Sequence, residues 1–236
     1  MKRIGTGISG LDNVLKGGIP EKNQIIVEGA PGTGKSSIAF SIVYNSAKQG
    51  IPSAFISLDE RAENVIKNAK TILGEDNQID ELIKKGMLVI DGEDFAAKIS
   101  TNTEPENSYS TANLVSGVEG IIKSINAEVV AIDSMSFLKL MMGKGLLYNK
   151  SVASVVSNLR RLNVTSVSTL DVPYYERERM KYSQELLLFD GVMALFKEGK
   201  KKEEEELVLE VVKMRGTDHE RVLSKYSITS KGIVLK

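Results

Sequence analysis

The segment from Gly29 to Ser36 matches the phosphate-binding pattern G-x-x-x-x-G-K-[ST] at every fixed position. Glycines let the backbone form a nest of inward N–H groups, and the helix that follows adds the positive end of its dipole. Lys35 is expected to reach the β- and γ-phosphates of a nucleotide, and the Ser36 hydroxyl to ligate Mg²⁺. The residues expected to contact the nucleotide are Gly29, Ala30, Pro31, Gly32, Thr33, Gly34, Lys35, Ser36 and Ser37.

The flanks of this segment have the patterns that a phosphate-binding loop requires. Residues 24–28 form a short apolar run that predicts a buried strand. After the loop, apolar residues recur at helical spacing, from Ile38 to Val43. The alternative, a glycine-rich turn that binds nothing, does not account for the strand–loop–helix arrangement. We therefore expect a nucleoside triphosphate site here.

A second anchor for magnesium is expected at an acid that follows a buried strand. Asp133 fits this role because it directly follows residues 128–132, a predicted strand that is apolar from Val129 to Ile132. The alternative is an aspartate that caps a helix or stabilises a turn, since Ser134 and Ser136 follow it. With a phosphate-binding loop upstream, the metal role is favoured.

Hydrolysis also needs a group that accepts a proton from the attacking water or orients it. Asp59 and Glu60 are the candidates, because they follow the apolar run 53–58. We expect the end of this strand to neighbour the phosphate loop, with one or both acids in the site. The alternative is a pair of solvated surface acids.

Strand patterns alternate with helical patterns along most of the chain. This order predicts an α/β fold with a mainly parallel sheet covered by helices on both faces, and ligands bound beyond the carboxyl ends of the strands. Residues 190–196 and 207–214 predict a C-terminal antiparallel hairpin, joined by a charged turn at 199–206. The polar residues 93–113 predict an exposed loop. The other predicted strands are residues 53–58, 87–90, 128–132 and 164–170.

Composition limits the alternatives. The chain has 236 residues and 42% apolar content, which suits one domain over 1–236. Lys plus Arg and Asp plus Glu both number 31, so no global charge attracts nucleic acid or membrane. With no cysteine and a single histidine, thiol chemistry and histidine metal clusters are excluded. Without a signal-like or membrane-spanning apolar run, we expect a cytoplasmic protein that does not contact membranes.

Several segments together resemble one family. They are residues 6–12 (TGISGLD), 17–20 (GGIP), 29–36 (GAPGTGKS), 59–60 (DE), 132–134 (IDS) and 213–219 (KMRGTDH). This combination is similar to the KaiC-like ATPases of the RecA superfamily, with archaeal single-unit relatives, including paralogues of RadA, as the nearer comparison. The resemblance implies a RecA-like phosphate-loop fold, ATP as ligand, Mg²⁺ as cofactor and ATPase activity. Only one ATPase unit is present, so circadian phosphotransfer is not implied.

The resemblance also implies a shared site. In such proteins subunits form rings or filaments, and Lys213 and Arg215 match residues that reach the γ-phosphate of ATP on the neighbouring subunit. His219 matches the histidine that follows them, and the resemblance places it among the nucleotide-binding residues. A cation supplied by a neighbour neutralises charge on the transferring phosphoryl group, so turnover would need assembly with a second copy or a related ATPase paralogue. From the bare sequence, Lys213 and Arg215 would instead be strand-end cations that face water.

Two positions depart from the family pattern. Relatives usually carry glutamate at the position of Asp59. The aspartate side chain is one methylene shorter than glutamate, and a misplacement of a catalytic group by about one ångström can lower the rate about a hundredfold. We therefore expect slow hydrolysis, or Glu60 in the role instead. Ser230 stands where relatives often have an aspartate. The aspartate at position 59 also permits an alternative function, a nucleotide-dependent regulatory scaffold that does not hydrolyse ATP.

A second alternative is an accessory protein of recombination or repair that binds single-stranded DNA. Cations interleaved with aromatic residues are the ingredients of such a surface. Acidic residues among them and the neutral overall charge argue against it. The residues concerned are Arg160, Arg161, Arg177, Arg179, Lys181, Tyr174, Tyr175 and Tyr182.

Overall fold

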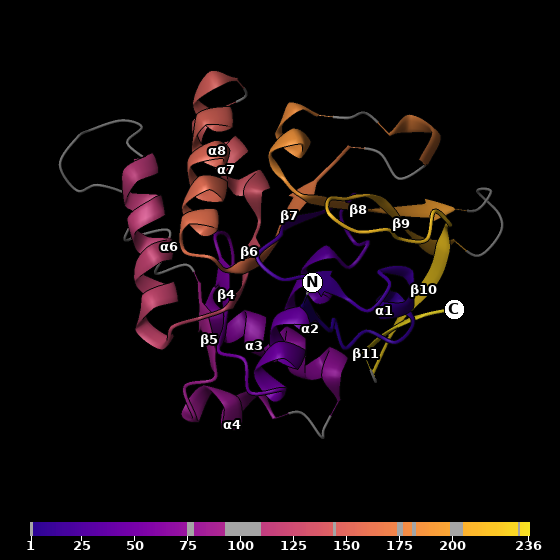
Figure 1. The fold of residues 1–236 in the computed structure, drawn as a ribbon, viewed down its shortest axis with the longest axis horizontal. Coiled ribbons are helices and arrows are strands. Elements are labelled where there is room, and N and C mark those ends of the chain that lie inside the picture. Colours follow the sequence, from indigo (N-terminus) through magenta and orange to yellow (C-terminus); the bar gives the residue numbers. More distant parts are fainter. Residues whose placement is uncertain are drawn as a thin grey trace.

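The computed structural model describes residues 2–74, 78–92, 110–143, 145–173, 177–180, 183–198, 205–230 and 232–236. Within these residues, nine strands form one sheet in the order β11-β10-β9-β8-β3-β7-β6-β4-β5 (Figure 1). The strands of this sheet are β3 (Gln24–Gly29), β4 (Ser53–Ser57), β5 (Leu88–Asp91), β6 (Val129–Asp133), β7 (Thr165–Asp171), β8 (Gly191–Glu198), β9 (Glu206–Met214), β10 (Ser224–Thr229) and β11 (Gly232–Leu235).

The sheet has a parallel part and an antiparallel part. From β5 to β8 every neighbouring pair is parallel, and β3 lies between β7 and β8. From β8 to β11 every pair is antiparallel. The carboxyl ends of β3, β7, β6 and β4 therefore meet at one edge, which is where ligands bind in such sheets.

Helices cover both faces of the sheet (Figure 1). Alternation along β3 serves both faces: Ile25 and Val27 pack in one core cluster with α2, α3 and α4, while Ile26 packs in another with α6, α7 and α8. Both clusters are buried, as expected for a parallel sheet. The helices are α1 (Leu11–Val14), α2 (Lys35–Lys48), α3 (Ala62–Leu73), α4 (Ile79–Lys84), α6 (Thr111–Ile125), α7 (Met135–Met142) and α8 (Leu146–Arg161), with short 3₁₀ helices η1 (Arg177–Arg179) and η2 (Gln184–Leu188).

The predicted fold class is confirmed. Two strands, β7 and β6, lie between β3 and β4 in the sheet. An apolar run predicts that a strand is buried, but it does not predict which strands lie beside it. Crossover helices can place a strand that comes later in the chain between two earlier ones. The C-terminal hairpin β8–β9 is confirmed, but β8 also pairs in parallel with β3, and β10 and β11 extend the sheet. Of the predicted polar loop at 93–113, residues 93–109 lie outside the described residues, and 111–113 begin α6.

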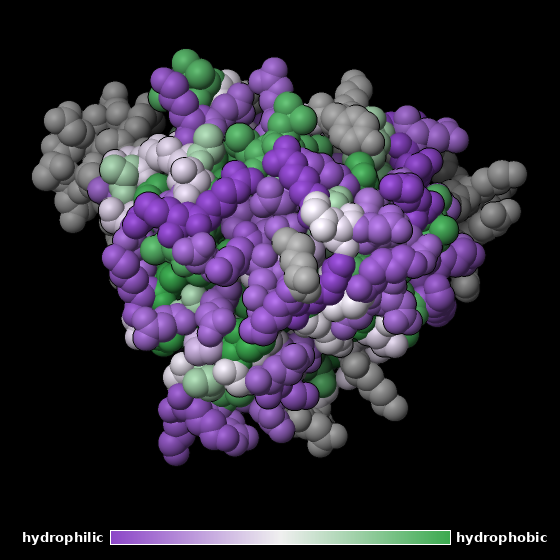
Figure 2. All heavy atoms as spheres, in the orientation of Figure 1, coloured by the Kyte–Doolittle hydropathy of each residue, from purple (hydrophilic) through white to green (hydrophobic). Residues whose placement is uncertain are grey.

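The N-terminal segment closes against the C-terminal strands. β1 (Arg3–Ile4) pairs with β2 (Ile19–Pro20), and the backbone N–H of Leu235 donates to the carbonyl of Ser9 at 2.9 Å. Figure 2 shows that the face seen in Figure 1 is covered mainly by hydrophilic residues. None of the helices in the described residues combines the length and the apolar character needed to cross a membrane.

Candidate nucleotide site

The phosphate-binding loop has the predicted local structure. β3 ends at Gly29 and α2 begins at Lys35, so the loop joins a buried strand to a fourteen-residue helix. Gly32 and Gly34 have φ angles of 80° and 87°, a region that glycine adopts without strain. At Gly34 a Cβ atom would also lie 2.4 Å from Ile228 Cδ1, so the end of the Ile228 side chain on β10 would have to move. The positive φ angle is therefore the main reason that glycine is favoured at this position.

Two hydroxyl groups hold the loop in place. The Thr33 hydroxyl donates to the carbonyl of Ala30 at 2.8 Å. The Tyr226 hydroxyl, from β10, donates to the carbonyl of Thr33, and both residues are buried. The antiparallel extension of the sheet thus supports the loop directly. The sequence patterns did not predict this contact.

Lys35 is buried at the start of α2, and its ammonium group has two partners. Its Nζ atom donates to the Ala30 carbonyl at 3.2 Å and lies 2.7 Å from Asp171 Oδ1. Asp171 is the last residue of β7, next to β3 in the sheet. The lysine is therefore held at the loop by a carboxylate that the sequence analysis did not select.

Asp133 lies at the end of β6 and is 7% exposed. Burial raises the pKa of its carboxyl group, and the hydroxyls of Thr169 and Ser36 and the charge of Lys35 oppose that rise. The Thr169 hydroxyl donates to Asp133 Oδ1. Ser134 occupies the N-cap of α7, so Asp133 itself is not the capping residue. The carboxyl group is instead directed at the first turn of α2.

Asp59 and Glu60 follow β4 and reach the same place despite the intervening strands. Burial raises the pKa of Asp59 to about 6, and the negative charge of Asp133 adds to that rise. The Glu60 carboxylate accepts from Asn68 Nδ2 at 2.9 Å. The Glu60 backbone N–H donates to the Ser57 hydroxyl at 3.0 Å. These contacts fix the chain beyond β4 so that both acids face the phosphate-binding loop.

Residues from four strand ends line one cavity of about 430 Å³, here named the phosphate cavity. Its lining residues are Pro31, Gly32, Lys35, Ser36, Asp59, Glu60, Asp133, Ser134 and Asp171. The structure therefore brings together the predicted Lys35, Ser36, Asp59, Glu60 and Asp133. Ser37 lies just outside, in a neighbouring pocket.

These residues fit a nucleotide with Mg²⁺. The Ser36 hydroxyl and the Asp133 carboxylate are adjacent oxygen donors, which Mg²⁺ prefers. Among the described residues, no group of three or more acidic or histidine side chains could hold a metal by itself. Magnesium sites of this kind normally take one or two carboxylates and complete their shell with substrate phosphates and water.

Asp171 is the site residue that the sequence analysis missed. A signal was available, because Asp171 directly follows the predicted strand 164–170. That is the same pattern of an acid after a buried strand that selected Asp133. Applied to each strand of the parallel sheet, the rule finds both residues.

Lys213 and Arg215 lie at the opposite edge of the sheet. Lys213 pairs with Val192 across the β8–β9 ladder, and the Arg215 backbone N–H donates to the carbonyl of Asp190 at 2.8 Å. Asp190 in turn donates to the carbonyl of Gln24, at the start of β3. β3 then runs about 17 Å, at about 3.3 Å per residue, to reach the phosphate loop. Neither cation can act on a nucleotide bound to its own chain.

His219 is also outside the phosphate cavity, and its Nδ1 atom is buried without a hydrogen-bond partner among the described residues. The cations considered for DNA have carboxylate partners: Arg160 with Asp190 at 3.1 Å, Arg161 with Glu119 at 2.6 Å. Arg177 forms two hydrogen bonds with Glu210, at 2.6 and 2.7 Å. Of the remaining residues of that prediction, Arg179 ends η1, and Tyr174, Tyr175, Lys181 and Tyr182 lie outside the described residues.

The fold and the loop define a nucleotide-binding α/β protein, and comparisons place it more closely. A protein-family model described as "ATPase: KaiC" matches residues 4–236. A UPF0273 protein of Aeropyrum pernix is 31% identical over 99% of this chain and 93% of its own length. The circadian clock oscillator protein KaiC of Picosynechococcus is 27% identical over 99% of this chain, which spans only 44% of that protein.

Solved structures agree with the sequence comparisons. A KaiC-like protein of Pyrococcus horikoshii superimposes with a TM-score of 0.84 and 25% identity, over 100% of this chain and 99% of that one. The chain therefore belongs to the KaiC-like ATPase family of the RecA superfamily. The resemblance found in the sequence and its RecA-like fold are confirmed.

Proposed function

We propose that residues 1–236 form one ATPase unit that binds ATP with Mg²⁺ in the phosphate cavity and hydrolyses it slowly. The observation that carries the proposal is the meeting of Lys35, Ser36 and Asp133 with Asp59 and Glu60 around one cavity. A phosphate cradle, a metal anchor and an acid for the water are the parts that phosphoryl transfer to water requires. ADP and phosphate are the expected products.

Each part has a role that follows from its position. The loop N–H groups and Lys35 hold the β- and γ-phosphates, and Ser36 and Asp133 hold Mg²⁺, which when bound neutralises phosphate charge. Asp59 is the better candidate to accept the proton of water, because its pKa of about 6 lies near the working pH. The Glu60 carboxylate is already engaged by Asn68. The short side chain of Asp59 favours slow turnover.

The position of Lys213 and Arg215 supports assembly. Because they lie about 17 Å from their own phosphate loop, they could act only on ATP bound to another chain. If the cation edge of one chain contacts the phosphate loop of another, the two chains use different surfaces. Such a contact is heterologous, and repeated heterologous contacts build rings or filaments. We propose a homo-oligomer in which each chain supplies these cations to its neighbour. We also propose that this assembly works in the cytoplasm.

Phosphate release by the purified protein tests the catalytic part. We expect Mg²⁺-dependent release from ATP by the wild type and no ATP binding by Lys35→Ala. Lys70→Ala is the control, because Lys70 pairs with Asp80 on the surface, outside the cavity. Normal ATP affinity in Lys35→Ala would overturn the site. Tight binding of ATP without any phosphate release would favour the regulatory scaffold instead.

A mixing experiment tests the shared site. Lys35→Ala keeps its cations but lacks a working loop, and Arg215→Ala has a working loop but lacks the cation. Each variant alone should be inactive, while the mixture should recover part of the wild-type rate at mixed interfaces. Co-assembly is checked by size-exclusion chromatography with light scattering. Absence of recovery despite co-assembly would contradict action across the interface.

A further inference from the structure

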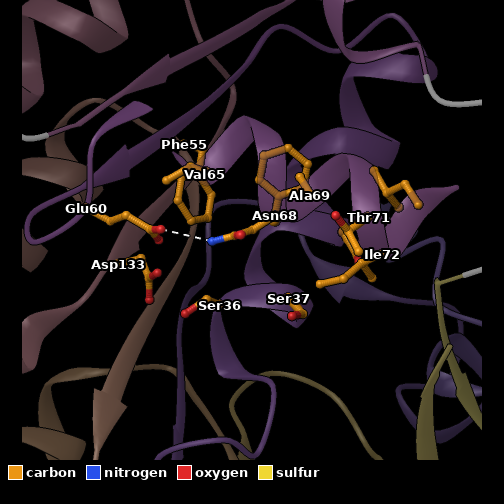
Figure 3. Close-up of a pocket in the computed structure, with 13 residues that line it drawn as sticks. Ser36, Ser37, Phe55, Glu60, Val65, Asn68, Ala69, Thr71, Ile72 and Asp133 are labelled. Atoms are coloured by element: carbon orange, nitrogen blue, oxygen red, sulfur yellow. Dashed lines mark hydrogen bonds between the residues drawn. The ribbon is translucent and has the colours of Figure 1, made fainter. Parts of the chain in front are cut away.

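A second cavity, of about 450 Å³, lies between α2 and α3 beside the phosphate cavity, and we name it the α2–α3 pocket. The two cavities share Ser36, Glu60 and Asp133. Figure 3 shows these residues at one end of the pocket and Ile72 of α3 toward the other. The volume falls in the range of pockets that hold small organic molecules.

One wall of the pocket is apolar. The rings of Phe40 and Phe55 lie with centroids 5.3 Å apart and tilted by 57°, and together they form part of the wall. Ala69 and Ile72 line it from α3. At Ala69 the helix presents only a methyl group, so space remains between α3 and the two rings. A flat apolar body would contact aromatic and aliphatic carbon along this wall.

The near end is acidic and polar. Glu60 and Asp133 contribute carboxyl groups, and no lysine or arginine is among the described residues that line the pocket. Ser37 and Ser41 add hydroxyl groups from α2. A negatively charged ligand would therefore be repelled, whereas a neutral or positively charged head that donates hydrogen bonds would be favoured.

Asn68 connects this pocket to the proposed chemistry. Its side chain lines the pocket and donates from Nδ2 to Glu60 Oε1 at 2.9 Å, as the dashed line in Figure 3 shows. A ligand head that donates hydrogen bonds would compete with Asn68 for the same carboxylate. Occupation of the pocket would then change the position of Glu60 at the edge of the phosphate cavity.

We infer that the α2–α3 pocket is a binding site for a small organic effector with an apolar, aromatic-sized body and a neutral or cationic hydrogen-bond-donating head. The effector acts on ATP turnover by displacing Asn68 from Glu60. The binding site stands on the pocket alone, while the effect on turnover rests on the proposed function.

The absence of cysteine from the chain allows a direct test of the site. Thr71 lines the pocket and is exposed, so Thr71→Cys places one thiol at its edge. The nucleotide-free protein is incubated with three small disulfides that can attach a benzyl, a benzylammonium or a benzoate fragment to the new thiol. Intact-mass spectrometry then follows how much of each fragment stays attached as β-mercaptoethanol is added. We expect the benzyl and benzylammonium fragments to resist about tenfold more reductant than benzoate, which corresponds to about 1.4 kcal/mol.

Two controls separate the pocket from general reactivity. Ser124→Cys places the thiol on the exposed face of α6, outside the pocket, and should retain the three fragments equally. Adding Ala69→Phe to Thr71→Cys fills the space along the apolar wall and should remove the preference, with circular dichroism as the check on folding. If that variant does not fold, Ala69→Leu replaces it. Equal retention of the three fragments at Thr71→Cys, or a preference that survives a filled and folded pocket, would overturn the site.

The effect on turnover is measured on the same labelled protein. The benzylammonium adduct and the Asn68→Ala variant should both lower kcat for phosphate release, while the Kd for ATP stays within about twofold. Selective labelling with unchanged kcat would overturn the link through Asn68. If neither the unlabelled Thr71→Cys protein nor the wild type releases phosphate, the proposed ATPase function fails. The labelling preference is measured without nucleotide, so it still decides whether the α2–α3 pocket is a binding site.

Discussion

The Lys35 ammonium group lies 2.7 Å from the Asp171 carboxylate, so the loop lysine is paired with an acid before any phosphate arrives. The side chain of Lys35 is 7% exposed and that of Asp171 is 42% exposed. The acid therefore neutralises a nearly buried cation while remaining open to solvent. A bound nucleotide would have to replace Asp171 as the partner of Lys35, and would bring negative phosphates close to its charge.

This competition predicts that Asp171→Asn binds ATP more tightly. Solvent screens the pair, so the gain should be modest, about two- to fivefold in Kd. Isothermal titration calorimetry with ATP and Mg²⁺ measures it. Asp80→Asn is the matched control, because it removes the carboxylate partner of Lys70 outside the phosphate cavity and should leave the Kd unchanged. Weaker binding by Asp171→Asn would indicate that Asp171 instead helps to hold the ligand.

A second prediction concerns the hydroxyl of Tyr226, which donates to the Thr33 carbonyl in the loop. Tyr226→Phe removes this buried hydrogen bond, so the free energy of unfolding should fall by about 1 kcal/mol. ATP affinity should weaken about fivefold, because the loop loses a support. Tyr44→Phe is the control: its hydroxyl accepts from the backbone of Gln78 at 3.0 Å, away from the loop. An equal change of affinity in both variants would contradict a specific role for Tyr226.

Much of the fold could be predicted from sequence because apolar runs and helical stripes report burial directly. The helical spacing from Ile38 to Val43, for example, falls within α2 (Lys35–Lys48). The order of the strands in the sheet was harder to predict. The apolar runs of β3 and β4 would be the same whether the two strands were adjacent or separated by others. The antiparallel strands β10 and β11 were missed because the two apolar residues of β10 are separated by a polar one and β11 is only four residues long.

The site was predictable where a fixed pattern or a strand end marks it, as for Lys35 and Asp133. It was not predictable where the chemistry depends on residues distant in sequence, such as Tyr226 against Thr33. The N-terminal signature is a further case. Thr6 donates from its hydroxyl and its backbone N–H to Asp12 Oδ1, at 2.7 and 2.8 Å, so this part of the family pattern shapes a turn.

The raised pKa of Asp59 predicts a dependence of stability on pH. Burial and the charge of Asp133 raise that pKa from 3.8 to about 6. The folded protein therefore binds a proton more tightly than the unfolded chain. The stability that Asp59 contributes is present below about pH 4 and is lost as pH rises through about 6. Relative to Asp59→Asn, the free energy of unfolding of the nucleotide-free wild type should fall over this window in urea titrations. A difference that stays flat from pH 4 to pH 7 would contradict the shift.

The last prediction concerns Asp190, which holds Arg215 at the edge of the sheet. Its Oδ1 atom lies 3.4 Å from Arg215 and 3.1 Å from Arg160, while Oδ2 accepts from the backbone of Gln24 at 3.0 Å. In Asp190→Asn, one oxygen can still accept from Gln24, but the amide no longer attracts the arginines. If Arg215 acts on the neighbouring chain from this position, kcat should fall about tenfold, while the Kd for ATP stays unchanged.

Glu210→Gln is the matched control for Asp190→Asn. Glu210 also binds an arginine, Arg177, through two hydrogen bonds, but that pair does not contact Arg215. Its loss should leave phosphate release unchanged, and thermal unfolding reports whether either variant is destabilised. A faster rate in Asp190→Asn would show that the acid restrains Arg215 instead of aligning it. Because Arg215 lies far from its own phosphate loop, either change in rate should appear only at protein concentrations where the chains assemble.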